Sequence, residues 1–139
     1  MFNPAITVEM LNGQAKANMP TFLGIEFTEI GDNYVCAKMP VDERTRQPFG
    51  ILHGGASVVL AETLGSTGAW LASDPTQVRC VGLEINANHI SSVKEGFVWG
   101  KATAVHVGRA TQVWEIRITD DNGKLVCISR ITMAVVPHK

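Results

Sequence analysis

Residues 55–73 read GASVVLAETLGSTGAWLAS and predict one long helix, which at 1.5 Å per residue spans roughly 28 Å. Its only charged residue is Glu62, whereas a helix at a protein surface normally has a polar face. Small residues at Ala61, Gly65 and Ala69 share one face, where a strand or a second copy of the helix can approach closely. The stretch therefore predicts a helix that a sheet wraps on most sides. Glu62 needs an explanation, because an unpaired buried carboxylate is costly.

Strand patterns lie on both sides of this helix. Six segments of strand-forming residues are expected to form a sheet: 22–30, 34–41, 78–89, 95–106, 109–119 and 124–136. The Asn-Gly pair in DDNG, residues 120–123, favours a tight hairpin before the last segment. No connection between the later strands is long enough for a crossover helix, so we expect antiparallel pairing. The predicted fold class is α+β, with one long central helix inside a curled antiparallel sheet of about six strands.

A short N-terminal helix is expected to begin after Thr7 as its N-cap and to run to about Asn18. Leu11 and Ala15 would share one face of it, and Pro20 would stop it. No repeat, low-complexity tract or linker divides the 139 residues. We therefore expect a single domain over residues 1–139, which is long enough to bury a real core.

Composition restricts the classes of function. The net charge is −1, so no broad electrostatic field would attract nucleic acid or an anionic membrane. The first residues have no basic region before an apolar stretch, which favours a cytoplasmic protein. Cys36, Cys80 and Cys127 have no C-x-x-C spacing and are expected to be reduced thiols. His106 and His138 lack the spacing of metal ligands, so no metal is expected.

Residues with catalytic chemistry gather around the start of the long helix. His53, Gly54 and Gly55 stand at its first turn, where backbone N–H groups lack helical acceptors and can hold an oxygen that gains negative charge. Gln47 adds a side-chain amide donor, and Ser66 lies four residues after Glu62, so its hydroxyl can donate to that carboxylate. This combination is typical of an acyl-transfer site.

Structural explanations of the same residues stay open at this point. The HGG sequence is also a common kind of helix cap, and Glu62 is also explained by a hydrogen-bonding partner in a nearby loop. His89 alternates in step with Val81, Leu83, Ile85 and Ala87 and is either an inward-facing histidine or a catalytic one.

Three segments carry a family resemblance: MPVDERTRQPFGILHGGASVVLAETLGS, VGLEINANHISSVKEG and VHVGR. They resemble hotdog-fold acyl-CoA thioesterases, especially the bacterial branch similar to phenylacetate-pathway, 4-hydroxybenzoyl-CoA and 1,4-dihydroxy-2-naphthoyl-CoA thioesterases. The core of the resemblance is a Gln, then HGG, then a Glu nine residues after the His. It covers nearly the whole chain and implies hydrolysis of an acyl-CoA, aromatic or of broad range, to free acid and CoA without a metal or redox cofactor.

The resemblance also implies roles for individual residues. Glu62 would be the nucleophile or general base, and the Gly54 N–H would polarise the thioester carbonyl. Gln47 and His53 would orient that carbonyl, and Ser66 would place the carboxylate or its water. The family implies a homodimer, usually paired into a homotetramer, in which the helix end of one subunit faces the carboxylate of the other.

Coenzyme A would lie along the strand that ends NANHISS, with its phosphates near VGR. The candidate CoA-binding residues are therefore Gly55, His89, Ser91, Ser92 and Arg109. Close relatives often carry Arg-Pro where this chain has the two serines, so phosphate binding would rest more on the arginine, on a nearby lysine at position 94 and on hydroxyls. Two alternatives remain: a non-enzymatic acyl-CoA-binding module, and an acyl hydratase or dehydratase, whose F-P-x-x-P-G motif is absent.

Overall fold

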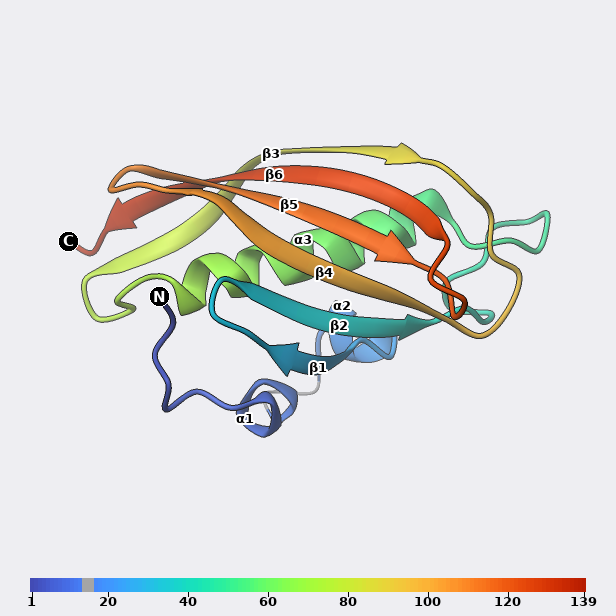
Figure 1. Cartoon of the computed structure of the whole chain (residues 1–139), viewed down its shortest axis with the longest axis horizontal. Helices are drawn as coiled ribbons and strands as arrows, with labels where there is room; N and C mark the ends of the chain where they lie inside the picture. Colours follow the sequence, from blue (N-terminus) through green and yellow to red (C-terminus); the bar gives the residue numbers. More distant parts are fainter. Residues whose placement is uncertain (14–16) are drawn as a thin grey trace.

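A computed structural model describes residues 1–13 and 17–139. Its elements in chain order are α1 (Val8–Asn12), α2 (Met19–Phe22), β1 (Glu26–Ile30), β2 (Tyr34–Pro40), α3 (Gly54–Leu71), β3 (Val78–His89), β4 (Phe97–Val107), β5 (Thr111–Thr119) and β6 (Leu125–Pro137). The strands form one antiparallel six-stranded sheet in the order β1-β2-β4-β5-β6-β3. Figure 1 shows this sheet curling around α3, as the α+β prediction required.

The small residues of α3 let the helix pack tightly onto the sheet. A Cβ added at Gly65 would lie 2.5 Å from Cγ2 of Ile131 on β6, and one at Gly68 would lie 2.8 Å from Cζ3 of Trp114 on β5. The partner of this face is therefore the sheet of the same chain, as one of the two alternatives predicted, and not a second helix. Larger side chains there would overpack a core in which Leu60 and Leu64 are fully buried.

The sheet wraps α3 and leaves one strip of the helix open. Glu62 and Trp70 are exposed, and Thr63, Ser66 and Thr67 are only half-buried. The curved sheet contacts α3 from β2 through β6, as the prediction of a wrapped helix required, and leaves open the strip that carries Glu62 and Trp70. Because Glu62 lies on that open strip, its charge needs no buried partner.

The N-terminal helix is shorter than expected. Thr7 is the N-cap, as predicted, with its Oγ1 accepting from the Met10 N–H at 3.2 Å, but α1 ends at Asn12. Pro20 is not a stop: it lies in the first turn of α2, where a missing N–H costs nothing, and Asn18 caps this second helix. The predicted place of Ala15 lies outside the described residues.

The two edges of the sheet differ. The side chain of Asn12 pairs with the backbone of Phe27 on β1, donating to its C=O at 2.9 Å and accepting from its N–H at 2.8 Å, and so occupies that edge. Strand β3 has 12 residues and pairs only with β6 in the described part of the chain, so its outer edge is open. An open edge of this length is a template for pairing with another chain.

A β-bulge in β3 changes which of its residues face the core. The register shifts between Gly82 and Glu84, and Cys80 and Ile85 both pack against the core although they are an odd number of residues apart. Val81 and Leu83 are consequently exposed, at 44% and 62%. The prediction that they share a face with Ile85 was therefore wrong, because one extra residue inverts the alternation.

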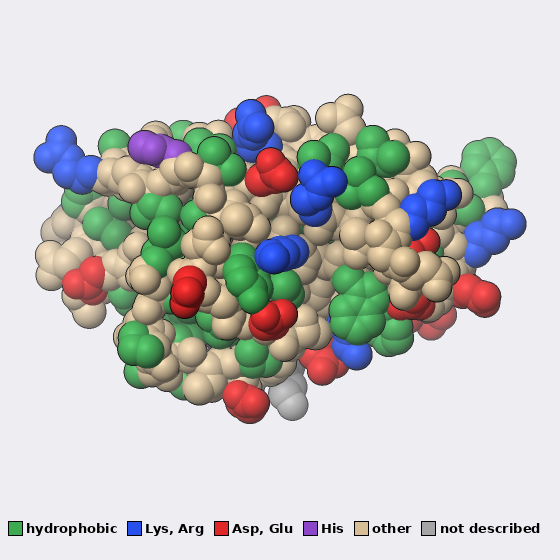
Figure 2. Space-filling model, viewed as in Figure 1, with side chains coloured by type: hydrophobic (Ala, Val, Ile, Leu, Met, Phe, Trp, Pro, Cys, Tyr) green, Lys and Arg blue, Asp and Glu red, His purple; other side chains and the backbone are tan. Residues whose placement is uncertain are grey.

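Surface charge agrees with the balanced composition. Figure 2 shows Lys and Arg side chains interspersed with Asp and Glu over the face formed by the sheet. Among the described residues, no helix is both long and apolar enough to cross a membrane. The three cysteines are free thiols, as expected, and burial raises the pKa of the Cys36 and Cys127 thiols. Neither of these two is therefore an activated thiolate at neutral pH.

Candidate active site

The first turn of α3 presents one free backbone donor. His53 is the N-cap, and its Nδ1 accepts a hydrogen bond from the Gly55 N–H at 2.8 Å. This bond occupies Gly55 and, in the neutral ring, leaves the proton of His53 on Nε2. The Gly54 N–H has no acceptor within the described residues. Of the two glycines, Gly54 is thus the one whose N–H, at the positive end of the helix dipole, can donate to a substrate oxygen.

Gln47 is held by the loop that precedes this turn. Its backbone N–H donates to the C=O of Ile51 at 2.8 Å, and its side-chain oxygen accepts from the Phe49 N–H. Gly50 closes the loop with φ +85°, a left-handed conformation that favours glycine. Because the amide oxygen is engaged, the half-buried Gln47 side chain keeps its NH₂ group for another acceptor.

His89 packs directly against the helix start. A Cβ added at Gly54 would lie 2.7 Å from Nε2 of His89, so the imidazole lies directly over this glycine. A pocket of about 370 Å³ brings together the residues predicted at this end: Gln47, Gly54, His89, Ser91 and Ser92. The hydroxyl of Ser91 donates to the C=O of Leu125, which fixes that side chain to the start of β6.

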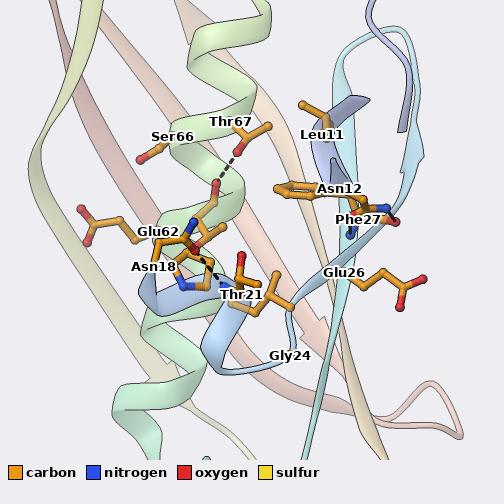
Figure 3. Close-up of a pocket in the computed structure, with 13 residues that line it drawn as sticks. Leu11, Asn12, Asn18, Thr21, Gly24, Glu26, Phe27, Glu62, Ser66 and Thr67 are labelled. Atoms are coloured by element: carbon orange, nitrogen blue, oxygen red, sulfur yellow. Dashed lines mark hydrogen bonds between the residues drawn. The ribbon is translucent and has the colours of Figure 1, made fainter. Parts of the chain in front are cut away.

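Glu62 lies in a different and larger cleft, of about 620 Å³. Figure 3 shows Glu62 and Ser66 on α3, with the N-terminal segment and β1 across the cleft. A Cβ added at Gly82 would lie 3.0 Å from Oε2 of Glu62, so the carboxylate reaches the middle of β3. In the described part of the chain, neither Glu62 nor Ser66 makes a side-chain hydrogen bond or ion pair. The predicted bond from Ser66 to Glu62 is absent, because water can serve both of these accessible groups.

The donors and the carboxylate are too far apart to serve one carbonyl within a single chain. Gly54 and Glu62 lie eight residues apart on α3, which corresponds to roughly 12 Å along the helix axis. A reacting carbonyl needs both groups within about 3 Å of its atoms. The separation agrees with their placement in two different pockets.

Arg109 is also distant from the serines with which it was grouped. It lies in the hairpin between β4 and β5, where the neighbouring Ala110 C=O accepts from the N–H of Val135. Val135 pairs with Cys80, near the start of β3, whereas Ser91 follows the end of that strand. Nine residues of strand separate positions 80 and 89, or roughly 30 Å. Within one chain, therefore, only Lys94 of the two predicted cations lies close to Ser92.

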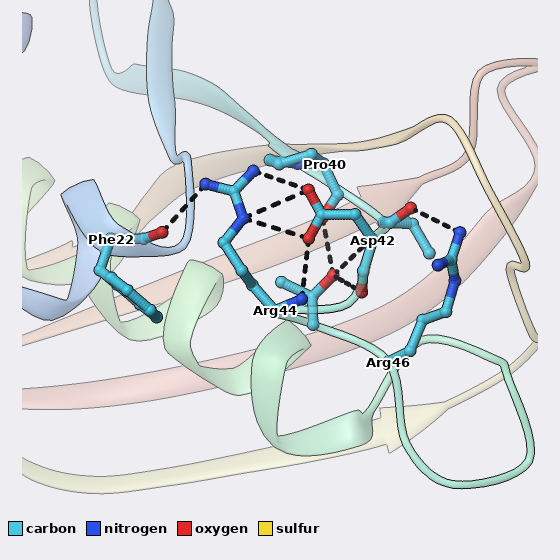
Figure 4. A network of polar contacts seen from close by, with 7 residues as sticks. Phe22, Pro40, Asp42, Arg44 and Arg46 are labelled. Carbon is cyan, nitrogen blue, oxygen red and sulfur yellow. Dashed lines mark hydrogen bonds and ion pairs between the residues drawn. The ribbon is translucent and has the colours of Figure 1, made fainter.

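The residues that hold the loop before α3 were not predicted from the sequence (Figure 4). Arg46 donates from Nε to the C=O of Lys94 at 3.0 Å and from Nη2 to the C=O of Val41 at 3.2 Å. The His53 N–H donates to the C=O of Thr45 at 2.8 Å. A polar and charged run, VDERTR, was the available signal, but its partners are backbone carbonyls that no sequence pattern identifies.

Comparisons with known proteins identify the family of the chain. Residues 49–127 match the Thioesterase superfamily. The chain is 53% identical to the 1,4-dihydroxy-2-naphthoyl-CoA hydrolase of Escherichia coli, over 94% of this chain and 96% of that protein. It is 47% identical to the proofreading thioesterase EntH of Cronobacter turicensis, over 94% and 95% of the two chains.

A solved structure extends the likeness to the whole fold. The crystal structure of a mutant of thioesterase PA1618 from Pseudomonas aeruginosa superimposes with a TM-score of 0.96 at 50% identity, covering 99% of both chains. The curled sheet around one central helix is therefore the hotdog fold of these enzymes. The chain belongs to the Thioesterase superfamily and is a thioester hydrolase.

Proposed function

We propose that the protein hydrolyses acyl-CoA thioesters to a free acid and CoA, with Glu62 as nucleophile or general base and the Gly54 N–H as the donor to the carbonyl oxygen. The observation that carries the proposal is the pair of complementary, unsatisfied groups on α3. Within the described residues, the Gly54 N–H has no acceptor at the helix start and the Glu62 carboxylate has no partner in the open cleft. The N–H can donate to the carbonyl oxygen of a thioester, and the carboxylate can act on its carbonyl carbon, directly or through a water.

The active site is composite and forms between two copies of the chain. The roughly 12 Å between Gly54 and Glu62 favours a site shared by two chains, and the open edge of β3 offers a pairing surface. Antiparallel pairing of two β3 edges continues the sheet and sets the end of each strand beside the middle of the other. If Gly82 faces the partner subunit's His89, the two-fold axis passes between Ile85 and Asn86. Glu62 then approaches the partner subunit's Gly54, and symmetry creates two identical sites.

The reaction at such a site has two possible routes. In one, a Glu62 oxygen attacks the thioester carbon, the C–S bond breaks to release CoA, and water then hydrolyses the mixed anhydride. In the other, Glu62 takes a proton from a water that attacks the same carbon. In both, the Gly54 N–H stabilises the developing oxyanion, the NH₂ of Gln47 and the Nε2–H of His53 orient the carbonyl, and Ser66 places the carboxylate or its water.

The coenzyme spans the same interface. Ser91, Ser92 and His89 line the pocket beside Gly54, while the N–H of the next residue, Gly55, is already bound to His53. Antiparallel β3 pairing brings the Arg109 hairpin of one subunit to the end of the sheet at which the partner subunit's serines lie. Arg109 would thus reach the CoA phosphates across the interface, and Lys94 would reach them within the chain. The cytoplasmic location and a tetramer made of two dimers stay predictions.

The acyl group is proposed to enter the cleft beside Glu62. Its volume of about 620 Å³ is ample for an aromatic ring, and Leu11, Ile25 and Phe27 give it apolar walls. The similarity to a 1,4-dihydroxy-2-naphthoyl-CoA hydrolase supports an aromatic acyl group. A non-enzymatic acyl-CoA-binding module is the second candidate, since the same clefts would bind the ligand without turnover.

A thiol-release assay tests the proposal across benzoyl, hydroxybenzoyl, hydroxynaphthoyl, short aliphatic and long aliphatic CoA esters. We expect turnover, with higher kcat/KM for the aromatic esters. Tight binding of every ester with no thiol release would favour the binding module. An enoyl-CoA that gains water without loss of CoA would favour a hydratase. An absence of both binding and release would refute the proposed function.

A further inference from the structure

One wall of the Glu62 cleft is a short helix that is not stable by itself. Helix α2 has four residues, none of which is buried, and Pro20 and Thr21 from it line the cleft together with Gly24. A single helical turn is unstable alone, because nucleation fixes several residues for very few hydrogen bonds. The position of this wall must therefore be set by contacts from elsewhere in the chain.

Arg44 supplies one of these contacts, in addition to the packing of α2 against α3. Its Nη1 donates to the C=O of Phe22, the last residue of α2, at 3.0 Å (Figure 4). Gly24 has φ +77°, and a Cβ added there would lie 3.1 Å from Nη2 of Arg44 and 2.8 Å from Cγ of Pro40. The guanidinium thus both binds the end of the helix and packs against the turn that follows it.

The other side of the same guanidinium is fixed to the loop that precedes α3. Nη2 donates to Oδ2 of Asp42 at 2.6 Å, and Nε contacts both oxygens of this carboxylate at 3.2 Å. The Asp42 C=O accepts from the N–H groups of Thr45 and Arg46 at 3.0 and 2.9 Å. Asp42 is thereby part of the turn that leads into Gln47, so Arg44 joins the wall of the cleft to the segment that carries the donors.

We propose that Arg44 is a positioning residue that fixes α2 against the cleft and so sets which acyl groups the enzyme accepts. This inference rests on the proposed function, because it assigns the cleft to the acyl group. The planar guanidinium of arginine can bind the C=O of Phe22 and the carboxylate of Asp42 together, whereas a lysine ammonium at the end of a flexible chain cannot hold the same geometry. A bulky acyl group would contact the α2 wall, and an acetyl group would not reach it.

The test compares Arg44→Ala and Arg44→Lys with Arg117→Ala, a matched control that removes an exposed arginine whose carboxylate contact is 3.7 Å long and lies outside the cleft. For Arg44→Ala we expect the KM of hydroxynaphthoyl-CoA to rise about tenfold, while kcat for this ester stays within about twofold of the parent value. Both KM and kcat for acetyl-CoA should also stay within about twofold of the parent values. Arg44→Lys should recover part of the loss, and Arg117→Ala should match the parent. Equal losses on both esters, or no loss on either, would overturn the inference.

A second measurement separates this inference from the proposed function. Hydrogen exchange at the amides of Phe22, Gly24 and Ile25 should become faster in Arg44→Ala and stay unchanged in Arg117→Ala, whether or not any ester is hydrolysed. If the parent protein has no thioesterase activity, binding of neutral 2-naphthamide replaces kinetics, and Arg44→Ala should weaken it about tenfold. Unchanged exchange in Arg44→Ala would refute the role of Arg44 even in an active enzyme.

Discussion

Replacing Glu62 with Gln separates a catalytic carboxylate from a structural one. The substitution keeps the shape of the side chain and removes its charge. Glu62 is exposed, and within the described residues its carboxylate has no hydrogen bond or ion pair to lose. We therefore expect the free energy of unfolding to change by less than about 0.5 kcal/mol, as for ordinary surface substitutions.

The catalytic effect of Glu62→Gln should be much larger. An amide neither attacks a thioester carbon nor takes a proton from water, so kcat should fall at least 10²-fold, about 2.7 kcal/mol in the activation barrier. KM should change little, because the lost interaction belongs to the transition state.

The assay measures the melting temperature and kcat on the same preparation of each protein. Glu9→Gln is the matched control, since Glu9 is also exposed but lines neither of the two site pockets, and it should leave both quantities unchanged. A Glu62→Gln protein that melts early and turns over normally would refute the reasoning. That result would mean that the Glu62 carboxylate stabilises the fold and takes no part in catalysis.

Three further predictions concern the interface, the coenzyme and pH. Mixing inactive Gln47→Ala and Glu62→Ala chains by co-refolding should restore part of the activity, because one site of a mixed dimer is intact; mixed dimers that stay inactive would contradict a shared site. Arg109→Ala should raise KM about tenfold for CoA esters, roughly 1.4 kcal/mol, and spare a thioester without the nucleotide; equal losses on both would move the phosphate site elsewhere. The hydrogen bond from Arg44 lowers the pKa of Asp42, so their pair stabilises the fold above the ordinary Asp pKa of about 3.9 and loses this contribution as pH falls through the lowered value. Amide protection around Phe22 should accordingly hold from pH 7 to about 5 and fall only in stronger acid, and earlier loss would contradict this assignment.

Local patterns in the sequence predicted most of the fold. The central helix was expected over residues 55–73 and spans Gly54–Leu71, because small and apolar residues without proline allow no other regular element of that length. The strand from 78 to 89 has the predicted bounds, and Gly123, with φ +82°, turns the last hairpin where DDNG was noted. Alternation and turn residues act over a few positions, so they can be recognised without knowing the fold.

The sequence also identified the groups at the candidate site, since HGG, Gln47 and Glu62 are unusual in their local settings. Their relative positions were decided only by tertiary structure. The curved sheet leaves Glu62 on the open strip of α3, and the rise of the helix puts it roughly 12 Å from the Gly54 N–H, in a separate cleft. The bulge at Gly82, the closure of the β1 edge by Asn12 and the bond from Arg44 to Phe22 each join residues that are paired only after the chain has folded. Such contacts depend on curvature and register summed over the whole sheet, which no short stretch of sequence encodes.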